Sequence, residues 1–260
     1  MENEILLFGG GEIGSYLKLH PKVVYENYSN IENIDFSSYS SVINCTFDKN
    51  YFRLEADIKK MFDWRLLNVA ERYPDLKFIF LSSRLVFDRS QITIYENTPF
   101  DKNPFNEYAR KKILLEKELM NIPNAVVVRL PNVFSASTPV NRFFGQLLND
   151  FCVKKKIYFD FMIDELREFV FAGDVAQFLL WLTYSDFQGC INYSYSDKIT
   201  ARDFIRIFQN EFGNCEVAFE NTPSNVQFTF DHSLVSKIYK KSKFESNEKA
   251  MKKVHAEWIK

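Results

Sequence analysis

A glycine-rich loop, GGGEIG (residues 9–14), directly follows an apolar segment near the start of the sequence. That segment predicts a strand over residues 5–8, and the pattern after the loop predicts a helix over residues 13–19 and a second strand over residues 23–25. Strand, helix and strand in so short a stretch form a βαβ unit, whose two strands run parallel. A chain with such a unit is expected to build an α/β sheet.

Three glycines of this loop fit the G-x-G-x-x-G spacing of dinucleotide-binding loops. Gly9 allows the tight turn, Gly11 lets the backbone approach a pyrophosphate, and Gly14 lets the helix pack closely on the strand. The N-terminus of the helix, with Glu12 and Ile13, then faces the phosphates. Glycine triplets also occur in ordinary turns, but the position between strand and helix favours a dinucleotide site.

An acidic residue, Glu26, follows the second strand. There a carboxylate can accept hydrogen bonds from both ribose hydroxyls of NAD and would repel the additional phosphate of NADP. The alternative is a solvated charge at a strand end. Since no arginine lies nearby, we expect NAD(P)H as the cofactor with a preference for NADH, while Lys18 and Lys22 leave NADPH open.

Strand and helix patterns continue to alternate along the chain. Further strands are predicted over residues 41–46, 76–81 and 124–130, and helices over residues 57–73 and 105–120. Alternation of this kind implies a parallel sheet covered by helices on both faces. The predicted fold is therefore a doubly wound α/β (Rossmann) domain with a small C-terminal substrate-binding lobe.

Polar or loop residues follow several of these strands. Because the carboxyl ends of parallel strands meet at one edge of the sheet, where ligands bind in such folds, these residues are candidate cofactor contacts. They are Asn44, Cys45, Thr46, Leu130 and Asn132.

The alternation becomes less regular after residue 134. We place the NAD(P)-binding domain at residues 1–134 and mainly the substrate lobe at 135–260, with helices over 141–152 and 201–212. A short strand and a capped helix within residues 166–195 are expected to pack back onto the first domain.

Tyr108 and Lys112 lie four residues apart in NEYARKKILLEKEL, and Ser83 ends an apolar strand. A free phenol, with a pKa of about 10, is too weak an acid to protonate a carbonyl oxygen at neutral pH. On a helix, the Lys112 ammonium shares a face with Tyr108 and lowers that pKa, while Ser83 can hydrogen-bond the same oxygen. The three residues are a candidate catalytic set for hydride transfer. The alternative is a chance pair on a surface helix.

The composition excludes several classes of protein. With 33 basic and 34 acidic residues and a formal net charge of −1, the chain is not expected to bind nucleic acid. We expect no membrane span, because the sequence has no long apolar stretch, and no signal peptide, because no basic region precedes the short apolar run at the N-terminus. No metal site is expected, because the four cysteines and three histidines are scattered. We expect a reduced, cytoplasmic protein.

Further segments carry a family resemblance: NCT, LSSRLVF, NEYARKK, VVVRLPNVF, REFVFAGDVA and INYSYSDKITARDF. With the glycine loop, and in this order, they resemble the extended short-chain dehydrogenase/reductase superfamily, particularly its bacterial nucleotide-sugar reductases and epimerases. The resemblance implies catalytic roles for Ser83, Tyr108 and Lys112, with Tyr108 and Lys112 also at the cofactor, and a nucleotide-diphosphate sugar as substrate.

The same resemblance implies three substrate contacts. Asn132 lies in a segment similar to the family's loop at the nicotinamide and the sugar nucleotide, Arg167 lies in one similar to a stretch near the diphosphate, and Arg84 follows the catalytic serine. Relatives pair two long helices in a homodimer, which we expect here through residues 57–73 and 105–120.

Departures from the family pattern reduce the number of reactions that the site could catalyse. The family's 4,6-dehydratases carry an Asp-Glu pair after the catalytic hydroxyl residue, whereas Arg84 and Leu85 stand here, so that dehydration and 3,5-epimerisation are not supported. Residues 31–42 are also short for the family's third strand and helix. Reduction of a nucleotide-activated 4-keto sugar, as in bacterial surface polysaccharide synthesis, is the leading hypothesis. A 4-epimerase with tightly bound NAD and a non-catalytic dinucleotide-binding protein are the alternatives.

Overall fold

The computed structural model describes residues 4–88, 93–140, 142–159, 162–195, 199–219, 229–240 and 246–258, without the side chains of Phe143 and Arg167. The chain divides into two compact units. The first contains Met1–Asp88, Glu96–Leu130 and Val175–Tyr193, and the second contains Arg89–Tyr95, Pro131–Asp174 and Ser194–Lys260. The division thus falls after Leu130, and Val175–Tyr193 joins the first unit.

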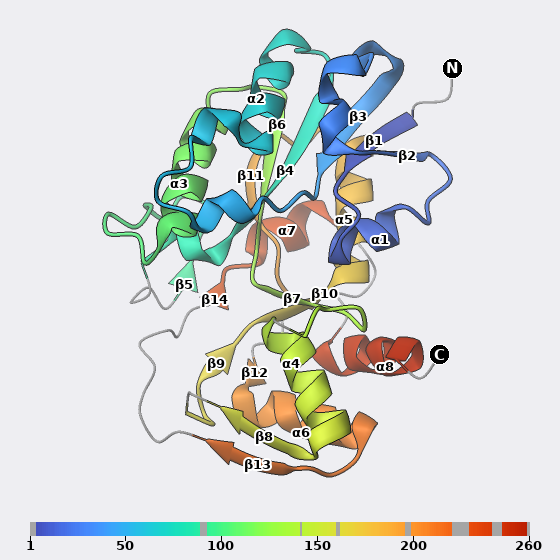
Figure 1. Ribbon diagram of the computed structural model, residues 1–260, viewed down its shortest axis with the longest axis vertical. Helices are drawn as coiled ribbons and strands as arrows, with labels where there is room; N and C mark the ends of the chain where they lie inside the picture. The colour runs from blue at the N-terminus through green and yellow to red at the C-terminus, as the bar shows by residue number, and fades with distance from the viewer. Residues whose placement is uncertain are drawn as a thin grey trace. The chain divides into compact units, whose positions relative to one another are not determined.

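The first unit is built on a sheet of six parallel strands in the order β11-β6-β4-β3-β1-β2 (Figure 1). The strands are β1 (Glu4–Phe8), β2 (Val23–Glu26), β3 (Tyr39–Asn44), β4 (Lys77–Ser83), β6 (Ala125–Leu130) and β11 (Gly189–Asn192). The chain runs from β1 to β2, returns past β1 to β3, and then continues outward. This reversal places the loops after β1 and β3 side by side, at the point where such sheets bind ligands.

Helices cover both faces of this sheet, which confirms the predicted doubly wound fold. Helices α2 (Phe62–Arg72) and α3 (Glu107–Leu119) pack on one face, where their apolar side chains form a buried core with those of β1, β3, β4 and β6. Helices α1 (Glu12–Leu17) and α5 (Ala172–Tyr184) lie on the other side (Figure 1). Because helices cover both faces, the central strands are buried along most of their length, as in the fully buried AVVVRL of β6, whereas no residue of the edge strand β2 is fully buried.

The prediction of one long helix over residues 57–73 is wrong for residues 57–61. The structure has two 3-10 helices, η3 (Lys49–Phe52) and η4 (Ile58–Lys60), and α2 begins only at Phe62. The Asp57 carboxylate accepts the N–H of Lys59 at 3.0 Å, and Met61 is extended, with φ −70° and ψ 147°. A short acidic side chain that bonds its own backbone in this way competes with a continuous helix.

Two further 3-10 helices, η1 (Tyr28–Asn33) and η2 (Phe36–Ser38), connect β2 to β3 in the place of a further strand and helix. Asn27 and Asp35 cap them through local hydrogen bonds of 3.0 and 3.1 Å to backbone N–H groups. Among the described residues no strand pairs with the outer side of β2, which therefore forms one edge of the sheet. The short segment 31–42 noted in the sequence thus leaves β2 at the edge of the sheet.

Two buried ion pairs hold α3 against its neighbours. Glu116 of α3 pairs with Arg129 of β6 at 2.7 Å, with both side chains only 1% exposed, and Glu116 also accepts the hydroxyl of Ser82. One turn earlier on the helix, Lys112 pairs with Asp63 of α2 at 2.9 Å. Charged side chains this deeply buried occur in pairs because an unpaired buried charge is very costly.

The second unit contains short strand pairs and helices. The pairs are β7 (Asn132–Phe134) with β10 (Phe169–Phe171), β8 (Lys156–Phe159) with β13 (Glu216–Phe219), β9 (Leu166–Arg167) with β12 (Ile199–Thr200), and β5 (Thr93–Ile94) with β14 (Thr229–Phe230). The helices are α4 (Phe143–Asn149), which continues as a π-helical turn (Asp150–Lys154), α6 (Ala201–Phe212), α7 (Ser233–Ile238) and α8 (Asn247–Trp258).

Phenylalanines form much of the core of this unit. Phe204 stacks on Phe169 at 4.1 Å between ring centroids and meets Phe134 edge-on at 6.3 Å, and Phe208 meets Phe151 at 4.6 Å. The predicted helix over residues 201–212 is confirmed, and Thr200 and Asp203 cap its N-terminus reciprocally. Among the described residues, no helix has the length and apolar character needed to cross a bilayer.

The Glu116–Arg129 pair predicts a non-additive effect on stability. Arg129→Met should lower the free energy of unfolding by about 3–5 kcal/mol, because it leaves the Glu116 carboxylate buried without its cation. Adding Glu116→Met should recover most of that loss, since neither charge remains. Urea unfolding of the two variants and the parent protein measures this, and additive losses would contradict it.

Candidate active site

The glycine loop lies between β1 and α1 and is tightly packed on the protein side. Gly9 has φ +90°, and a Cβ placed there would come within 3.0 Å of the Cys45 backbone. A Cβ at Gly14 would collide with the carbonyl oxygen of Gly9. At Gly11 a Cβ would meet nothing within 4 Å. The loop therefore has the closed turn, the close packing and the one open backbone position that a dinucleotide pyrophosphate requires.

Glu12 and Ile13 form the first turn of α1, where Ile13 is buried and Glu12 is half-buried. Glu26 ends β2 beside Phe8 and accepts a hydrogen bond from the Asn30 amide at 3.3 Å. The Lys18 ammonium lies 3.3 Å from the centroid of the Tyr25 ring and next to Gly10. Thus both an acidic and a basic side chain lie close to the loop.

The end of β3 lies against this loop. The Cys45 N–H donates to the Phe8 carbonyl at 2.8 Å. Asn44 is buried, and its side-chain oxygen accepts the N–H and the hydroxyl of Thr46 at 3.0 and 2.7 Å. Burial raises the pKa of the Cys45 thiol, which favours the neutral form. The side chains of Asn44 and Thr46 are thus bonded within the protein, and the backbone of this turn faces the loop.

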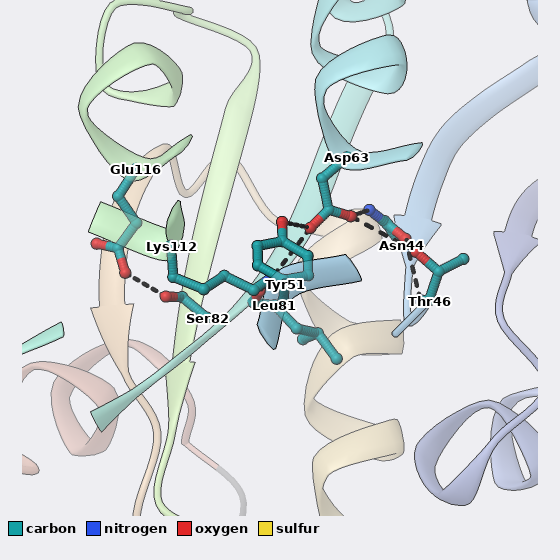
Figure 2. Close-up of polar contacts among 8 residues, drawn as sticks. All are labelled: Asn44, Thr46, Tyr51, Asp63, Leu81, Ser82, Lys112 and Glu116. Carbon is teal, nitrogen blue, oxygen red and sulfur yellow. Dashed lines mark hydrogen bonds and ion pairs between the residues drawn. The ribbon is translucent and has the colours of Figure 1, made fainter. Parts of the chain in front are cut away.

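Lys112 is the centre of a buried polar network (Figure 2). Its ammonium donates to an Asp63 carboxylate oxygen at 2.9 Å and to the Leu81 carbonyl at 3.1 Å. Asp63 also accepts the hydroxyl of Tyr51 and, at 2.5 Å, the amide of Asn44. The network therefore links α3, α2, η3 and the ends of β3 and β4.

Burial by itself would lower the pKa of Lys112, but the charges of Asp63 and of an ionised Tyr108 outweigh it, so that the pKa of Lys112 is raised. Burial, and then the charge of Asp63, raises the pKa of Tyr51. The folded protein thus favours a charged Lys112 beside a neutral Tyr51.

Tyr108 is half-buried and lies in an aromatic cluster. Its ring stacks on Phe52 at 5.5 Å between centroids and 18° between planes. Tyr51 meets it edge-on at 5.5 Å, and Phe47 lies at 6.2 Å. The cluster holds the Tyr108 ring, which lies one helical turn before Lys112, against η3.

Ser83 is the last residue of β4, and its hydroxyl oxygen accepts the Leu85 N–H at 3.3 Å, which caps a short 3-10 helix, η5 (Arg84–Val86). Arg84 is half-buried in that helix. Since Lys112 bonds the Leu81 carbonyl two residues before Ser83, the structure brings the end of β4 and the Tyr108–Lys112 helix together.

The remaining predicted residues lie further along the chain. Leu130 is buried at the end of β6 in the first unit. Asn132 belongs to the second unit, where its amide donates to the Glu168 carbonyl at 3.1 Å. The backbone of Arg167 pairs with Ile199, while its side chain lies outside the described structure. The roles assigned to all three stay predictions.

Sequence reasoning missed Asp63 and Tyr51. Asp63 comes 49 residues before Lys112, in the first turn of a helix where an acidic residue usually faces solvent. Nothing in its local pattern distinguishes a buried carboxylate from an exposed one. Within the described part of the chain, no cluster of His, Cys, Asp and Glu could hold a metal ion.

Comparison with known proteins identifies the family. The sequence profile of the NAD dependent epimerase/dehydratase family matches residues 35–189, more than half of the chain. The protein belongs to this family. The predicted superfamily and the nicotinamide dinucleotide cofactor are thereby confirmed. None of the curated proteins matches the sequence significantly.

Solved structures share the fold of this epimerase/dehydratase family member. An NAD-dependent NDP-hexosamine 5,6-dehydratase involved in tunicamycin biosynthesis has a TM-score of 0.82 and 18% identity, over 99% of this chain and 98% of that chain. A UDP-N-acetylglucosamine 4-epimerase from Methanobrevibacter ruminantium has a TM-score of 0.82 and 16% identity, over 100% and 99%. A dTDP-4-dehydrorhamnose reductase from Clostridium acetobutylicum has a TM-score of 0.77 and 15% identity, over 99% and 100%.

The glycine loop predicts different effects of an added methyl group at Gly14 and at Gly11. Gly14→Ala should lower the free energy of unfolding by about 2 kcal/mol or more, because the new Cβ meets the Gly9 carbonyl. Gly11→Ala should cost about 1 kcal/mol or less in the free protein, since its Cβ has space, yet should weaken dinucleotide binding. Chemical unfolding and titration with NADH measure the two effects. Equal losses of stability would contradict the assignment.

The raised pKa of Tyr51 predicts a loss of stability in alkali. Above pH about 10 the unfolded tyrosine ionises while the folded one stays neutral, so the free energy of unfolding should fall as pH rises. Tyr51→Phe should remove this contribution to the slope and should cost about 1–3 kcal/mol at neutral pH, since Asp63 loses a donor. Urea unfolding between about pH 8 and pH 11 measures both. The exposed Tyr28, changed to Phe, is the control, and identical slopes for the parent and the Tyr51 variant would contradict the prediction.

Proposed function

We propose that this protein is an NAD(P)H-dependent reductase of the keto group of a nucleotide-activated 4-keto sugar. Support comes from the first unit, where Lys112 and the aromatic-held Tyr108 share one face of α3 beside the end of β4, which carries Ser83. The family includes this class of substrate chemistry in its solved relatives, one of which is a dTDP-4-dehydrorhamnose reductase.

One observation favours reduction over dehydration: the carboxylates nearest to Lys112 are already engaged. Asp63 accepts hydrogen bonds from Lys112, Tyr51 and Asn44, and Glu116 pairs with Arg129. Both carboxylates are buried, so neither is placed to remove a proton from a bound sugar. Arg84 and Leu85 after Ser83 supply no acid or base of this kind. Simple ketone reduction needs only one proton donor.

A nicotinamide dinucleotide held at the glycine loop would supply the hydride. Ser83 donates a hydrogen bond to the carbonyl oxygen and orients it, and Tyr108 transfers its phenolic proton to that oxygen as the carbon–oxygen double bond becomes a single bond. The resulting phenolate is stabilised by the Lys112 charge and regains its proton from solvent.

Lys112 has one hydrogen left for the cofactor. An ammonium group has three N–H donors, and Asp63 and Leu81 take two of them. The third can bond a hydroxyl of the nicotinamide ribose. In the same proposal the backbone of Gly11, Glu12 and Ile13 binds the pyrophosphate, and Glu26 binds the adenine ribose in preference to a phosphate, which favours NADH.

The proposed homodimer would bury polar surface. The positions of α2 and α3 that stay exposed are Asn68, Glu71, Arg72, Lys117 and Glu118, while their apolar side chains pack on the sheet. Contact between two copies through these helices would therefore depend on charge pairs and weaken with salt.

The proposal predicts consumption of NADH or NADPH with one member of a panel of nucleotide-linked 4-keto-6-deoxy sugars. Tyr108→Phe should lower kcat by about 10²-fold or more, because the proton donor is lost. Tyr73→Phe is the matched control, since Tyr73 has the same spacing to Lys77 but packs on Phe36 in the core. The loss of absorbance by the reduced nicotinamide measures turnover.

Two outcomes would change the assignment. Full activity in Tyr108→Phe would contradict the mechanism. Interconversion of unmodified nucleotide sugars without added cofactor, by protein that carries NAD as purified, would identify a 4-epimerase that uses the same three residues.

A further inference from the structure

The proposed reductase mechanism needs a positive charge on Lys112, yet the structure buries that ammonium. The side chains of Lys112 and Asp63 are only 7% and 4% exposed. Besides the Asp63 carboxylate and the Leu81 carbonyl, the ammonium faces the Tyr51 ring at 4.6 Å. A lysine in such surroundings loses its proton unless an anion compensates for the lost hydration.

Asp63 is held so that it can act as that anion. Its two oxygens accept hydrogen bonds from donors on three other elements: Lys112 on α3, Tyr51 on η3, and Asn44 at the end of β3 (Figure 2). The arrangement therefore fixes the position of the Asp63 carboxylate beside the ammonium group.

The other titratable groups around Lys112 cannot replace it. Tyr51 favours its neutral form, because burial and the neighbouring carboxylate raise its pKa. Glu116 lies one turn further along α3 but forms its own ion pair with Arg129. An ionised Tyr108 also raises the pKa of Lys112, but its charge acts less strongly than that of Asp63. Asp63 is thus the anion that Lys112 contacts directly, at 2.9 Å.

We propose that Asp63 is a positioning residue of the active site, whose carboxylate keeps Lys112 protonated and directs its ammonium between α2, α3 and the end of β4. The catalytic consequence rests on the proposed function, because it assumes that the Lys112 charge acts on Tyr108. The charge state of Lys112 itself does not depend on any reaction. The inference can therefore be tested separately from turnover.

The decisive experiment is a pH titration of the protein with ¹³Cε-labelled lysine, followed by NMR. Loss of a signal in Lys112→Met assigns Lys112. In the parent protein the Lys112 midpoint should lie above those of exposed lysines, and in Asp63→Asn it should fall by about two units or more. Asp63→Glu, which keeps the carboxylate, should restore a high midpoint. Glu116→Gln, which breaks the other buried ion pair of α3, should leave the Lys112 midpoint within about half a unit of the parent.

A Lys112 midpoint that is unchanged in Asp63→Asn would overturn the inference, whatever the enzymatic activity. If Asp63→Asn does not fold, the parent protein still decides: a Lys112 midpoint below those of exposed lysines would overturn the proposal, and a midpoint above them, retained in Asp63→Glu, would support it.

Activity provides the second measurement. Asp63→Asn should lose at least about tenfold in kcat at neutral pH and regain part of it as pH falls, because Lys112 is then protonated again. Asp63→Glu should keep the pH profile of the parent. If the midpoint shifts as expected but no keto sugar is reduced by any form of the protein, the proposed function fails while Asp63 retains its effect on Lys112.

Discussion

The candidate active site depends on the ion pair between Lys112 and Asp63. Tyr108, Lys112 and Glu116 follow one another at four-residue intervals along one face of α3. Lys112 ties this face to α2 through Asp63, and Glu116 ties it to β6 through Arg129. Two buried charge pairs one turn apart fix both the rotation and the axial position of the helix. The Tyr108 ring is thereby brought against η3, and Lys112 is held close to the end of β4 that carries Ser83.

A second constraint is steric and lies at the glycine loop. Gly9 and Gly14 leave no space for a side chain, because β1, α1 and the turn after β3 meet there. The sheet reverses its direction of growth at this point, between β1 and β3. A dinucleotide site therefore follows from two independent features of the fold, the packed glycines and the strand order. The short 3-10 helices between β2 and β3 leave β2 at the edge of the sheet, so Glu26 ends an edge strand.

These two constraints meet at the end of β3. The backbone of Cys45 lies on Gly9, while the neighbouring Asn44 donates to Asp63. The turn after β3 thus contacts the cofactor loop on one side and the network that holds Lys112 on the other. If the proposed hydride transfer takes place here, this connection would keep the dinucleotide and the proposed proton donor at a constant distance, because both would be held by the end of β3.

Elements whose pattern is set locally were predicted well. Each of these strands and helices buries a set of positions that recurs with the period of its secondary structure. This pattern is visible in the apolar runs of β1, β4 and β6 and in the periodicity of α3 and α6. The prediction failed at residues 57–61, where the Asp57 side chain caps a 3-10 turn and the chain straightens at Met61. A short acidic side chain can either cap a turn or lie within a helix, and the two conformations have nearly equal energy. The packing of α2 therefore determines which of them forms.

The doubly wound fold, the dinucleotide loop and the Tyr108–Lys112 pair can be read from the sequence, since they rest on glycine positions and helical spacing. The contacts of Lys112 follow from the packing of the folded chain. Asp63 and Tyr51 are distant from it in the chain, and their burial depends on how η3 and α2 pack against α3. A carboxylate in the first turn of a helix looks the same in the sequence whether it faces water or an ammonium group. The physical difference is desolvation, which is a property of the folded neighbourhood and not of the residue.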